Sequence, residues 1–454
     1  MNTRYIKKIG VYGLGDTGTN VLEFLATIKA QKELYAWDDN QQHLQSYIHK
    51  YTHIIFTNEY ELWRELDFII VSPGISQKHP TQHKIYSIAL QHRIPILSDI
   101  DLFVQAHESS FLIAVTGTNG KSTITSLIEY ILYESINLVV SAGNIGKAVL
   151  SPEVMYRNSA YYVLELSSFQ LETLSHITFF DIGIILNITA DHTDRYFLFH
   201  DYYKAKHKLL RHIRKVLIIY VDSPCNLKFF LNLQNSIIKK RIQIIPLSNQ
   251  YILTTGISLI NKKFYLNRIG DYMYRQSFFN TTLYEEALLV IYALFRYFQF
   301  IDFFYYLQYF SGLKHRFEII YQNMTVIAIN DSKATNTAAT IYALQNLQTI
   351  HWISGGVYKE KSLSSLKKYT SNIVDCYFIG RDSSKFIDFA KNHQLTYYSC
   401  KSLRESLCVI RERVHSGTIL LSPSCSSFDY WDSYSARGKD FKKIIKYLFF
   451  NDVM

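Results

Sequence analysis

Short apolar segments alternate along this chain with longer segments in which apolar residues recur every three or four positions. The segments Lys8–Tyr12, Phe68–Val71 and Phe111–Val115 are short and largely apolar, which is typical of buried strands. Over Ile124–Tyr133 the apolar spacing instead fits one face of a helix. Regular alternation of this kind predicts an α/β fold with parallel sheets.

The alternation continues over 454 residues, a length that favours about three domains with separate cores. We predict a Rossmann-like α/β domain over residues 1–99, a central P-loop ATPase-type domain with a parallel sheet over 100–312, and a C-terminal Rossmann-like α/β domain over 313–454. In the third domain the predicted strands are 326–329, 351–354, 376–379 and 418–421. A polar or glycine-containing turn follows each of them, and ligands bind at such turns in parallel sheets.

The most apolar tract, Tyr292–Phe310, is predicted to be one packed amphipathic helix because Arg296, Gln299 and Asp302 interrupt it. No run of 18 apolar residues occurs, and no apolar leader precedes the first strand, so we expect no membrane insertion. The five cysteines form no C-x-x-C pair, which indicates a reducing, cytoplasmic location.

The formal net charge of +10 favours anionic partners. Lysine and arginine are scattered, however, with only short pairs and no basic arm, so we expect no nucleic-acid partner. The positive charge instead suits small substrates that carry phosphate groups.

A glycine-rich turn, Gly117-Thr118-Asn119-Gly120-Lys121-Ser122-Thr123, lies between the strand that ends near Val115 and the helix that follows. Free backbone N–H groups and the helix dipole at such a turn attract a phosphate chain. The Lys121 side chain can reach the terminal phosphates, and the Ser122 hydroxyl can hold a magnesium ion. We therefore predict that this turn binds ATP.

A second glycine turn, Gly13-Leu-Gly15-Asp16-Thr17-Gly18, follows the first strand, and Asp38 ends the next one. This spacing satisfies the dinucleotide fingerprint, so an NAD-dependent oxidoreductase is an alternative function. A dehydrogenase does not require the separate nucleotide loop at Gly117, which counts against that alternative.

Three polar positions follow other predicted strands of the central domain. They are Asn144, Glu165 and His192. A carboxylate and an imidazole at strand ends beside a phosphate loop suit magnesium coordination, although histidine is a less usual ligand for this ion.

In this order the motifs resemble the Mur ligases along nearly the whole chain, and most closely the branch of that family that adds D-glutamate. The resemblance rests on the two glycine turns, on Ser72-Pro-Gly-Ile75, Gly143-Asn-Ile-Gly146, Glu165–Glu172 and Asp191–Arg195, and on Gly312–Glu318, Asn330–Asn336, Leu421–Asp429 and Arg437-Gly438. It implies three α/β domains and an ATP-dependent acid–amino-acid ligase that works through an acyl phosphate.

The resemblance also implies site residues. The UDP-sugar would be held by Gly15, Asp16, Thr17, Asp38, Ser72, Pro73 and Gly74. ATP would be held by Gly117–Thr123 together with Asn144, Arg316 and Asp331. Mg2+ would be bound by Ser122, Glu165, His192 and a carbamylated Lys206, and the catalytic residues would be Lys121, Glu165, His192 and Lys206. D-glutamate would be bound by Lys333, Thr335, Lys359, Ser427 and Phe428.

By the same resemblance the substrates are UDP-N-acetylmuramoyl-L-alanine, D-glutamate and ATP, the pathway is peptidoglycan precursor synthesis, and the protein is a cytoplasmic monomer. The alternatives are a ligase for another amino acid, a folylpolyglutamate synthetase-like ligase, or an ATP-binding protein with impaired catalysis.

Three positions depart from the family pattern. Glu286 stands where an asparagine is expected near adenine, Ala190 stands where an acidic residue is frequent, and residues 217–222 lack the usual asparagine–aspartate turn. We expect the Glu286 carboxylate to weaken ATP binding by repulsion, and an asparagine there to restore it.

Overall fold

The computed structural model describes residues 8–28, 32–78, 81–144, 147–192, 195–234, 241–273, 283–299, 303–307, 310, 312–360 and 362–450. The chain divides into two compact units. One contains Met1–Phe278 and Glu285–Tyr309, and the other contains Phe279–Tyr284 and Phe310–Met454. The boundaries at residues 99 and 312 remain predictions.

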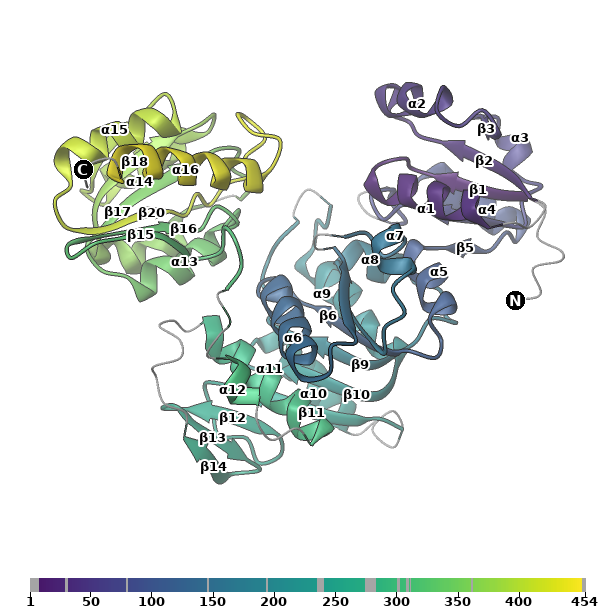
Figure 1. Ribbon diagram of the computed structural model, residues 1–454, viewed down its shortest axis with the longest axis horizontal. Coiled ribbons are helices and arrows are strands. Elements are labelled where there is room, and N and C mark those ends of the chain that lie inside the picture. Colours follow the sequence, from purple (N-terminus) through teal and green to yellow (C-terminus); the bar gives the residue numbers. More distant parts are fainter. Residues whose placement is uncertain are drawn as a thin grey trace. The chain divides into compact units, whose positions relative to one another are not determined.

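The first sheet has five parallel strands in the order β3-β2-β1-β4-β5 (Figure 1). Its strands are β1 Lys8–Tyr12, β2 Glu33–Trp37, β3 Ile54–Phe56, β4 Phe68–Val71 and β5 Ile96–Leu97. The helices of this region are α1 Asp16–Thr27, α2 Gln41–Ile48, α3 Tyr60–Trp63, α4 Lys84–His92 and α5 Asp99–Ala106. Since β1 and β4 are neighbours, the glycine turn after β1 lies beside the Ser72 turn after β4.

The second sheet has nine strands in the order β14-β13-β12-β11-β10-β9-β6-β8-β7. The strands are β6 Phe111–Thr116, β7 Val139–Gly143, β8 Tyr161–Glu165, β9 Phe180–Ile185, β10 Ile213–Tyr220, β11 Gln243–Ser248, β12 Ile257–Ile260, β13 Lys263–Leu266 and β14 Ile269–Met273. The helices are α6 Lys121–Ile136, α7 Pro152–Met155, α8 Ser168–Thr173, α9 Phe199–His207, α10 Pro224–Gln234, α11 Leu283–Phe298 and α12 Phe303–Leu307, with the 3-10 helix η1 Lys208–His212. Because β6 lies between β8 and β9, the segments that follow these three strands meet at one edge.

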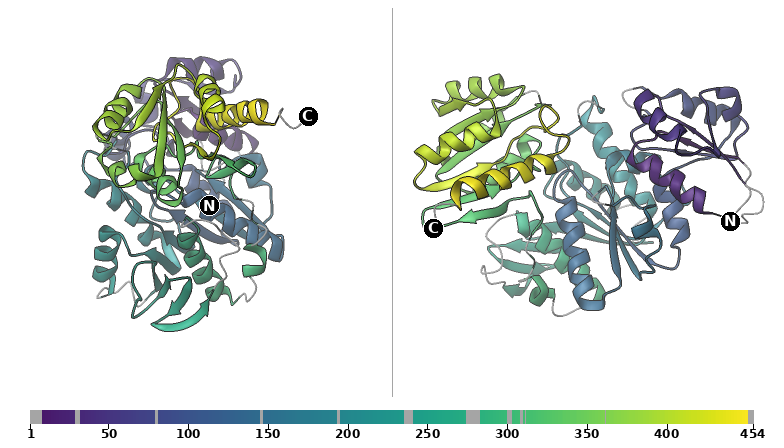
Figure 2. Two further views of the ribbon diagram at one scale, coloured as in Figure 1. Left: turned by 90° about the vertical axis from the view of Figure 1, so that its left-hand side faces the viewer. Right: turned by 45° about the horizontal axis from the view of Figure 1, so that its top comes forward.

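The third sheet has the order β15-β16-β20-β17-β18-β19, and only β15 is antiparallel to its neighbour. Its elements are β15 Glu318–Gln322, β16 Val326–Asn330, α13 Thr337–Asn346, β17 Ile350–Gly355, η4 Ser364–Asn372, β18 Ile373–Ile379, α14 Ser383–Asn392, β19 Thr396–Ser399, α15 Leu403–Arg413, β20 Gly417–Leu421 and α16 Tyr434–Phe449. Trp352 packs with the side chains of α13 and α14, whereas Ile353 packs with those of α15 and α16. Helices therefore cover both faces of this sheet (Figure 2).

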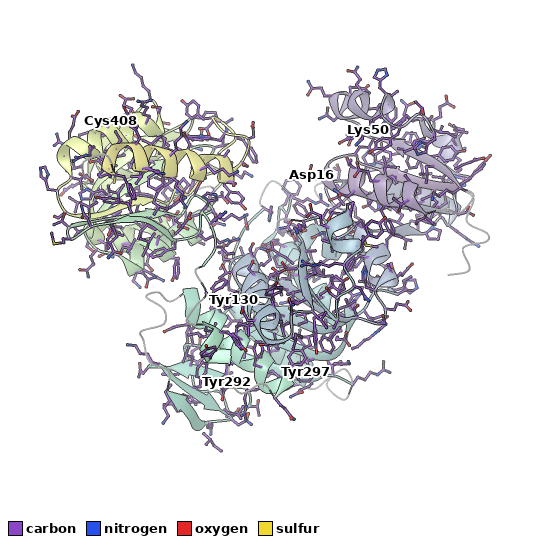
Figure 3. All side chains as sticks on the ribbon, viewed as in Figure 1. Asp16, Lys50, Tyr130, Tyr292, Tyr297 and Cys408 are labelled. Carbon is purple, nitrogen blue, oxygen red and sulfur yellow. The ribbon has the colours of Figure 1, made fainter. Side chains whose placement is uncertain are left out.

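The α/β class and the strands expected in all three regions are confirmed, but one helix was predicted wrongly. The tract Tyr292–Phe310 is not a single helix, because α11 ends at Phe298 and α12 begins at Phe303. Gln299 has a φ of 60°, a left-handed conformation that cannot continue an α-helix. Tyr292 of α11, which Figure 3 labels, stacks on Phe264 of β13 with ring centroids 4.3 Å apart, so packing against the sheet fixes the part of the tract before the break.

Within the described residues no helix combines the length and the apolar character needed to cross a membrane. The expected absence of nucleic-acid partners is not tested by this observation.

Two neighbouring carboxyl groups at the start of α5 have opposite environments. Asp101 accepts hydrogen bonds from the Ser98 backbone and hydroxyl at 2.7 and 2.8 Å, and from Ser175 N at 3.1 Å. The Asp99 side chain is also buried, but its Oδ1 atom has no hydrogen-bond partner. Burial raises the pKa of Asp99 to about 7, and the Asp101 charge adds to the rise.

We predict that Asp99→Asn removes a pH-dependent loss of stability. The folded-state pKa of Asp99 lies above its unfolded value, so wild-type stability decreases as pH rises from about 4 to about 7. Relative to the variant, the wild-type free energy of unfolding should decrease by about 3 kcal/mol between pH 5 and pH 8, measured by urea unfolding. Asp388→Asn, on an exposed face of α14, serves as the control. Equal pH slopes for wild type and Asp99→Asn would contradict the prediction.

Candidate active site

The glycine-rich turn connects β6 to α6 and has a backbone that only glycine adopts easily. Gly117 has a φ of 155° and Gly120, at the N-terminus of α6, a φ of 82°. A Cβ atom added to Gly117 would lie 2.6 Å from the Leu186 Cβ, so the turn also needs glycine for space. The turn therefore presents backbone N–H groups at the start of a 16-residue helix, as phosphate binding requires.

The segment after β9 holds this turn in place through Asn187 and Thr189. Thr118 N donates to Asn187 O at 2.8 Å, and Asn119 N donates to the Asn187 side-chain oxygen at 3.3 Å. The Thr118 hydroxyl donates to Thr189 O at 3.0 Å and accepts from Thr189 N at 3.0 Å. Sequence reasoning gave no role to Asn187 or Thr189, because their proximity to the turn follows from the pairing of β6 with β9.

Three side chains of the predicted ATP and metal sites begin α6. The Lys121 ammonium donates to Gly117 O at 3.0 Å and to Thr118 O at 2.8 Å, so it lies over the turn. Ser122 and Thr123 are buried, and the Thr123 hydroxyl has no hydrogen-bond partner. A buried polar atom without a partner is costly, and a ligand group bound at the turn would complete its environment.

Glu165 ends β8, and only one of the two oxygens of its buried carboxylate has a hydrogen-bond partner. The side chain is 2% exposed, Oε1 accepts from the Asn144 amide at 3.1 Å, and Oε2 has no partner. Asn144 follows β7, so the two predicted residues come from adjacent strands. An unpaired carboxylate oxygen beside a phosphate loop fits a hard divalent cation.

Lys206 lies inside the protein rather than on a solvated helix face. It is 2% exposed, and its ammonium lies 4.8 Å from the centre of the Tyr202 ring, one turn earlier on α9. Burial lowers the pKa of Lys206 well below its usual value, and the Lys121 charge lowers it further. The charges of Asp191 and Glu165 act in the opposite direction, so the fold brings Lys206 near Lys121, Glu165 and Asp191.

His192 occupies the rim of this region. Its side chain is 43% exposed, its φ is 52°, and its Nε2 atom lies 3.9 Å from Asp191 Oδ2. In the described part of the chain, no three His, Cys, Asp or Glu side chains cluster closely enough to hold a metal ion. Sequence reasoning used Asp191 as part of the motif Asp191–Arg195 but gave it no role of its own, which its position next to His192 could have suggested.

The first glycine turn is shaped by two of the predicted UDP-sugar residues. Asp38 accepts from Leu14 N at 2.5 Å and from Asn40 N at 2.7 Å, while the Ser72 hydroxyl donates to Gly13 O at 2.7 Å. An added Cβ on Gly15 or Gly74 would meet no atom within 4 Å, so these two glycines border open space. Asp16 is exposed, and Thr17 and Pro73 are half-buried.

Arg195 connects the Ser72 turn to the central region. One guanidinium nitrogen donates to Gly74 O at 3.0 Å, another lies 3.5 Å from Glu172 Oε2, and the group packs 4.2 Å from the centre of the Phe169 ring. Its Nε atom is buried without a hydrogen-bond partner. The sequence gave Arg195 no role, although it fixes the position of a predicted substrate turn.

In the second unit, Asp331 follows β16 and accepts from Phe317 N at 3.2 Å and from the Ser422 hydroxyl at 2.9 Å. Burial raises the pKa of Asp331 to about 7, and the neighbouring Arg316 charge lowers it in part. Arg316 is half-buried. Arg316 and Asp331 are therefore close enough for their charges to interact. That both residues contact ATP remains a prediction.

The predicted amino-acid pocket is only partly assembled by the second unit. Lys333 lies with its ammonium 3.7 Å from the centre of the Tyr434 ring, and Thr335 N donates to Lys333 O at 2.8 Å. Ser427 is buried, whereas Lys359 is exposed and Phe428 is 69% exposed. The aromatic ring at Lys333 is thus Tyr434, which sequence reasoning missed.

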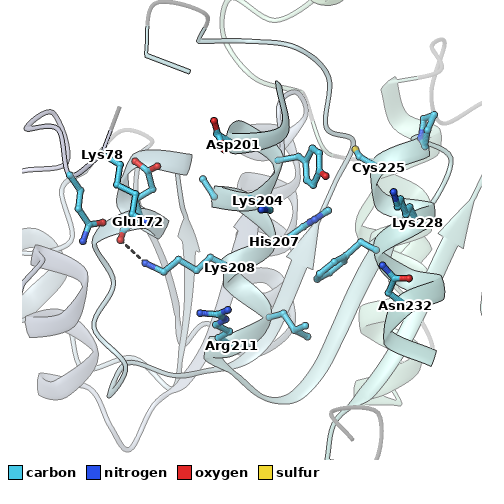
Figure 4. A pocket seen from close by; sticks show the side chains of 16 residues that line it. Lys78, Glu172, Asp201, Lys204, His207, Lys208, Arg211, Cys225, Lys228 and Asn232 are labelled. Carbon is cyan, nitrogen blue, oxygen red and sulfur yellow. Dashed lines mark hydrogen bonds between the residues drawn. The ribbon is translucent and has the colours of Figure 1, made fainter. Parts of the chain in front are cut away.

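A cavity of about 940 Å³ borders α9 on the side that does not carry Lys206 (Figure 4). Its lining includes Lys204, His207, Lys208 and Arg211, while Lys206 is absent from it. We place the candidate site at the phosphate loop rather than in this cavity, because the unpartnered buried polar atoms of Thr123 and Glu165 lie at the loop and the adjoining strand end.

Residues 115–262 match the family model described as the Mur ligase middle domain. The chain is 34% identical to a UDP-N-acetylmuramoylalanine--D-glutamate ligase of Rickettsia prowazekii, covering 98% of this chain and 99% of the relative. It is 32% identical to a protein of the same name in Buchnera aphidicola, over 99% of this chain and 100% of the relative. The fold is similar to that of a MurF ligase from Thermotoga maritima in complex with ADP, with a TM-score of 0.61, 12% identity and 100% coverage of both chains.

Proposed function

The chain belongs to the Mur ligase family, and from that premise we propose that it is an ATP-dependent ligase that adds D-glutamate to UDP-N-acetylmuramoyl-L-alanine. This reaction makes a peptidoglycan precursor, so the protein would serve cell-wall growth. The observation that carries the proposal is the convergence of Lys121, Glu165 and Lys206 at the phosphate loop.

A carboxylate resists attack by an amine, so the first step activates it. An oxygen of the L-alanine carboxylate attacks the γ-phosphorus of ATP, the bond to the β-phosphate bridging oxygen breaks, and an acyl phosphate and ADP form. Negative charge gathers on the transferred phosphoryl group. The backbone N–H groups of the turn and the Lys121 ammonium stabilise that charge.

In the second step the neutral D-glutamate amine attacks the acyl carbon. The tetrahedral intermediate expels inorganic phosphate, and the amine nitrogen loses a proton as the amide forms. Lys333, Thr335 and Ser427 offer ammonium and hydroxyl groups for the two carboxylates of the amino acid. The ring of Tyr434 against Lys333 limits where that ammonium can lie.

The donor set fits Mg2+, because Glu165 offers an unpaired oxygen and Ser122 a buried hydroxyl. Bound at Ser122, Glu165 and His192, the ion would neutralise phosphate charge. A Lys206 carbamate would supply further anionic oxygen ligands beside those of Glu165. Carbamylation requires a neutral amine, and the lowered pKa of Lys206 supports it.

Two observations favour this proposal over the oxidoreductase and over ligases for other amino acids. The turn after β1 would hold the UDP moiety rather than NAD, since a second nucleotide loop serves the chemistry. The choice of D-glutamate over other amino acids rests on the names of the relatives. We also propose that the protein acts in the cytoplasm, where its substrate ATP is available, and that it acts as a monomer.

A substrate panel tests the reaction. The full chain, UDP-N-acetylmuramoyl-L-alanine, ATP and Mg2+ should release phosphate with D-glutamate and not with L-alanine, L-lysine or meso-diaminopimelate. Phosphate release with a folate as the acid substrate would indicate the folylpolyglutamate synthetase-like alternative, and tight binding of NAD would indicate the oxidoreductase alternative. Turnover with another amino acid but not D-glutamate, or ATP binding without any amide product, would exclude the proposal.

We predict that Lys206→Ala abolishes turnover, because it removes the amine that becomes the carbamate. Lys204→Ala and Lys208→Ala on the same helical segment should retain activity, as their ammonium groups lie on the cavity side. Short carboxylic acids should partly restore the Lys206→Ala variant by supplying the missing carboxylate. Full activity of Lys206→Ala would reject the assignment.

We predict that Tyr434→Ala raises the Michaelis constant for D-glutamate about tenfold, because Lys333 loses the ring that positions it. Phe428→Ala should change that constant by less than about twofold, since the ring is largely exposed. Steady-state kinetics with saturating ATP measure both. A larger increase for Phe428→Ala than for Tyr434→Ala would instead show that the Phe428 ring, and not the Tyr434 ring, supports D-glutamate binding.

A further inference from the structure

Glu286 lies near the start of α11, and its carboxyl group is directed at the segment after β9. Its Oε2 atom accepts from the Asn187 amide nitrogen at 2.7 Å. The same oxygen would lie 3.9 Å from a Cβ atom added to Gly120, the glycine that directly precedes α6. The carboxyl group therefore lies beside the phosphate-binding turn.

Asn187 transmits this contact to the turn. Its side-chain nitrogen is bonded to Glu286, and its side-chain oxygen accepts from Asn119 N at 3.3 Å. The orientation of one amide group thus depends on both partners. Loss of the Glu286 acceptor would free the amide to rotate and weaken its bond to the turn.

The surroundings of Glu286 disfavour its charge. Burial raises its pKa to about 7, the Asn187 bond lowers it in part, and the nearby Asp222 charge raises it again. Tyr220 on β10 also interacts with the Glu286 charge. The adjacent Glu285 bonds instead to the Asn249 amide at 3.2 Å and lies near Lys262.

We infer that Glu286 is a positioning residue for the nucleotide turn, that it acts through the Asn187 side chain, and that protonation of its carboxyl group favours nucleotide binding. A neutral carboxyl group keeps an oxygen acceptor for Asn187 and removes a negative charge beside the turn that receives phosphates. The inference rests on the proposed use of ATP. It also reverses the expectation for asparagine, whose side chain is one methylene shorter and does not reach Asn187 in the same way.

The pH dependence has a definite sign. Nucleotide affinity should decrease as pH rises through about 7, because Glu286 then ionises. Glu286→Gln keeps an acceptor oxygen but cannot ionise. Its affinity should therefore equal that of wild type at pH 6 and exceed it about threefold at pH 8.

Calorimetric titration of the full chain with ADP tests the inference without requiring turnover. Glu286→Ala and Asn187→Ala should each weaken ADP binding about tenfold. The double variant should bind ADP little more weakly than either single variant, because both residues act on the turn through the same Asn187 side chain. Glu285→Gln, one residue away and bonded to Asn249, is the matched control and should bind as wild type does.

Additive losses in the double variant, an equal loss in Glu285→Gln, or the same pH profile in wild type and Glu286→Gln would overturn the inference. A protein that binds ADP as described but forms no amide would instead reject the proposed ligase reaction. Glu286→Asn adds a direct comparison, and we expect weaker ADP binding than for Glu286→Gln.

Discussion

The structure of the candidate site depends on the contact between the glycine turn after β6 and the segment after β9. At Gly117 the two run so close that a single added carbon would meet Leu186. Asn187 and Thr189 then fix the turn by backbone and side-chain hydrogen bonds. Because β6 and β9 are paired in register, the sheet itself sets the position of the turn and of the N–H groups that we propose for phosphate binding.

The second organising feature is the burial of charge around that turn. Lys206 and Glu165 are both almost inaccessible to water, and Lys206 interacts with the charges of Lys121, Asp191 and Glu165. Removing a charge from water is costly unless a partner compensates it. The cluster is therefore suited to ligands that bring charge of their own, such as a nucleotide with a cation.

Patterns along the chain predicted most of the helices and strands, but not all of them and not all of their limits. The strands β1 and β4 have the predicted limits, because apolar runs between polar turns leave little choice. The tract Tyr292–Phe310 contains no proline or glycine that would announce a break, yet the left-handed backbone of Gln299 follows the end of α11. The antiparallel strands β13 and β14 were missed, since runs of only four and five residues give too little periodicity to separate a strand from a loop.

The sequence by itself determined the α/β class, the two glycine turns and the position of the lysine that we propose for phosphate binding, because local chemistry imposes these patterns. It could not determine which side chains face one another, since that depends on strand order. Tertiary structure alone placed Lys206 in the interior, brought Asp191 near it and put Tyr434 against Lys333. It also directed Glu286 to Asn187, because residues 99 positions apart meet only when α11 packs beside the end of β9.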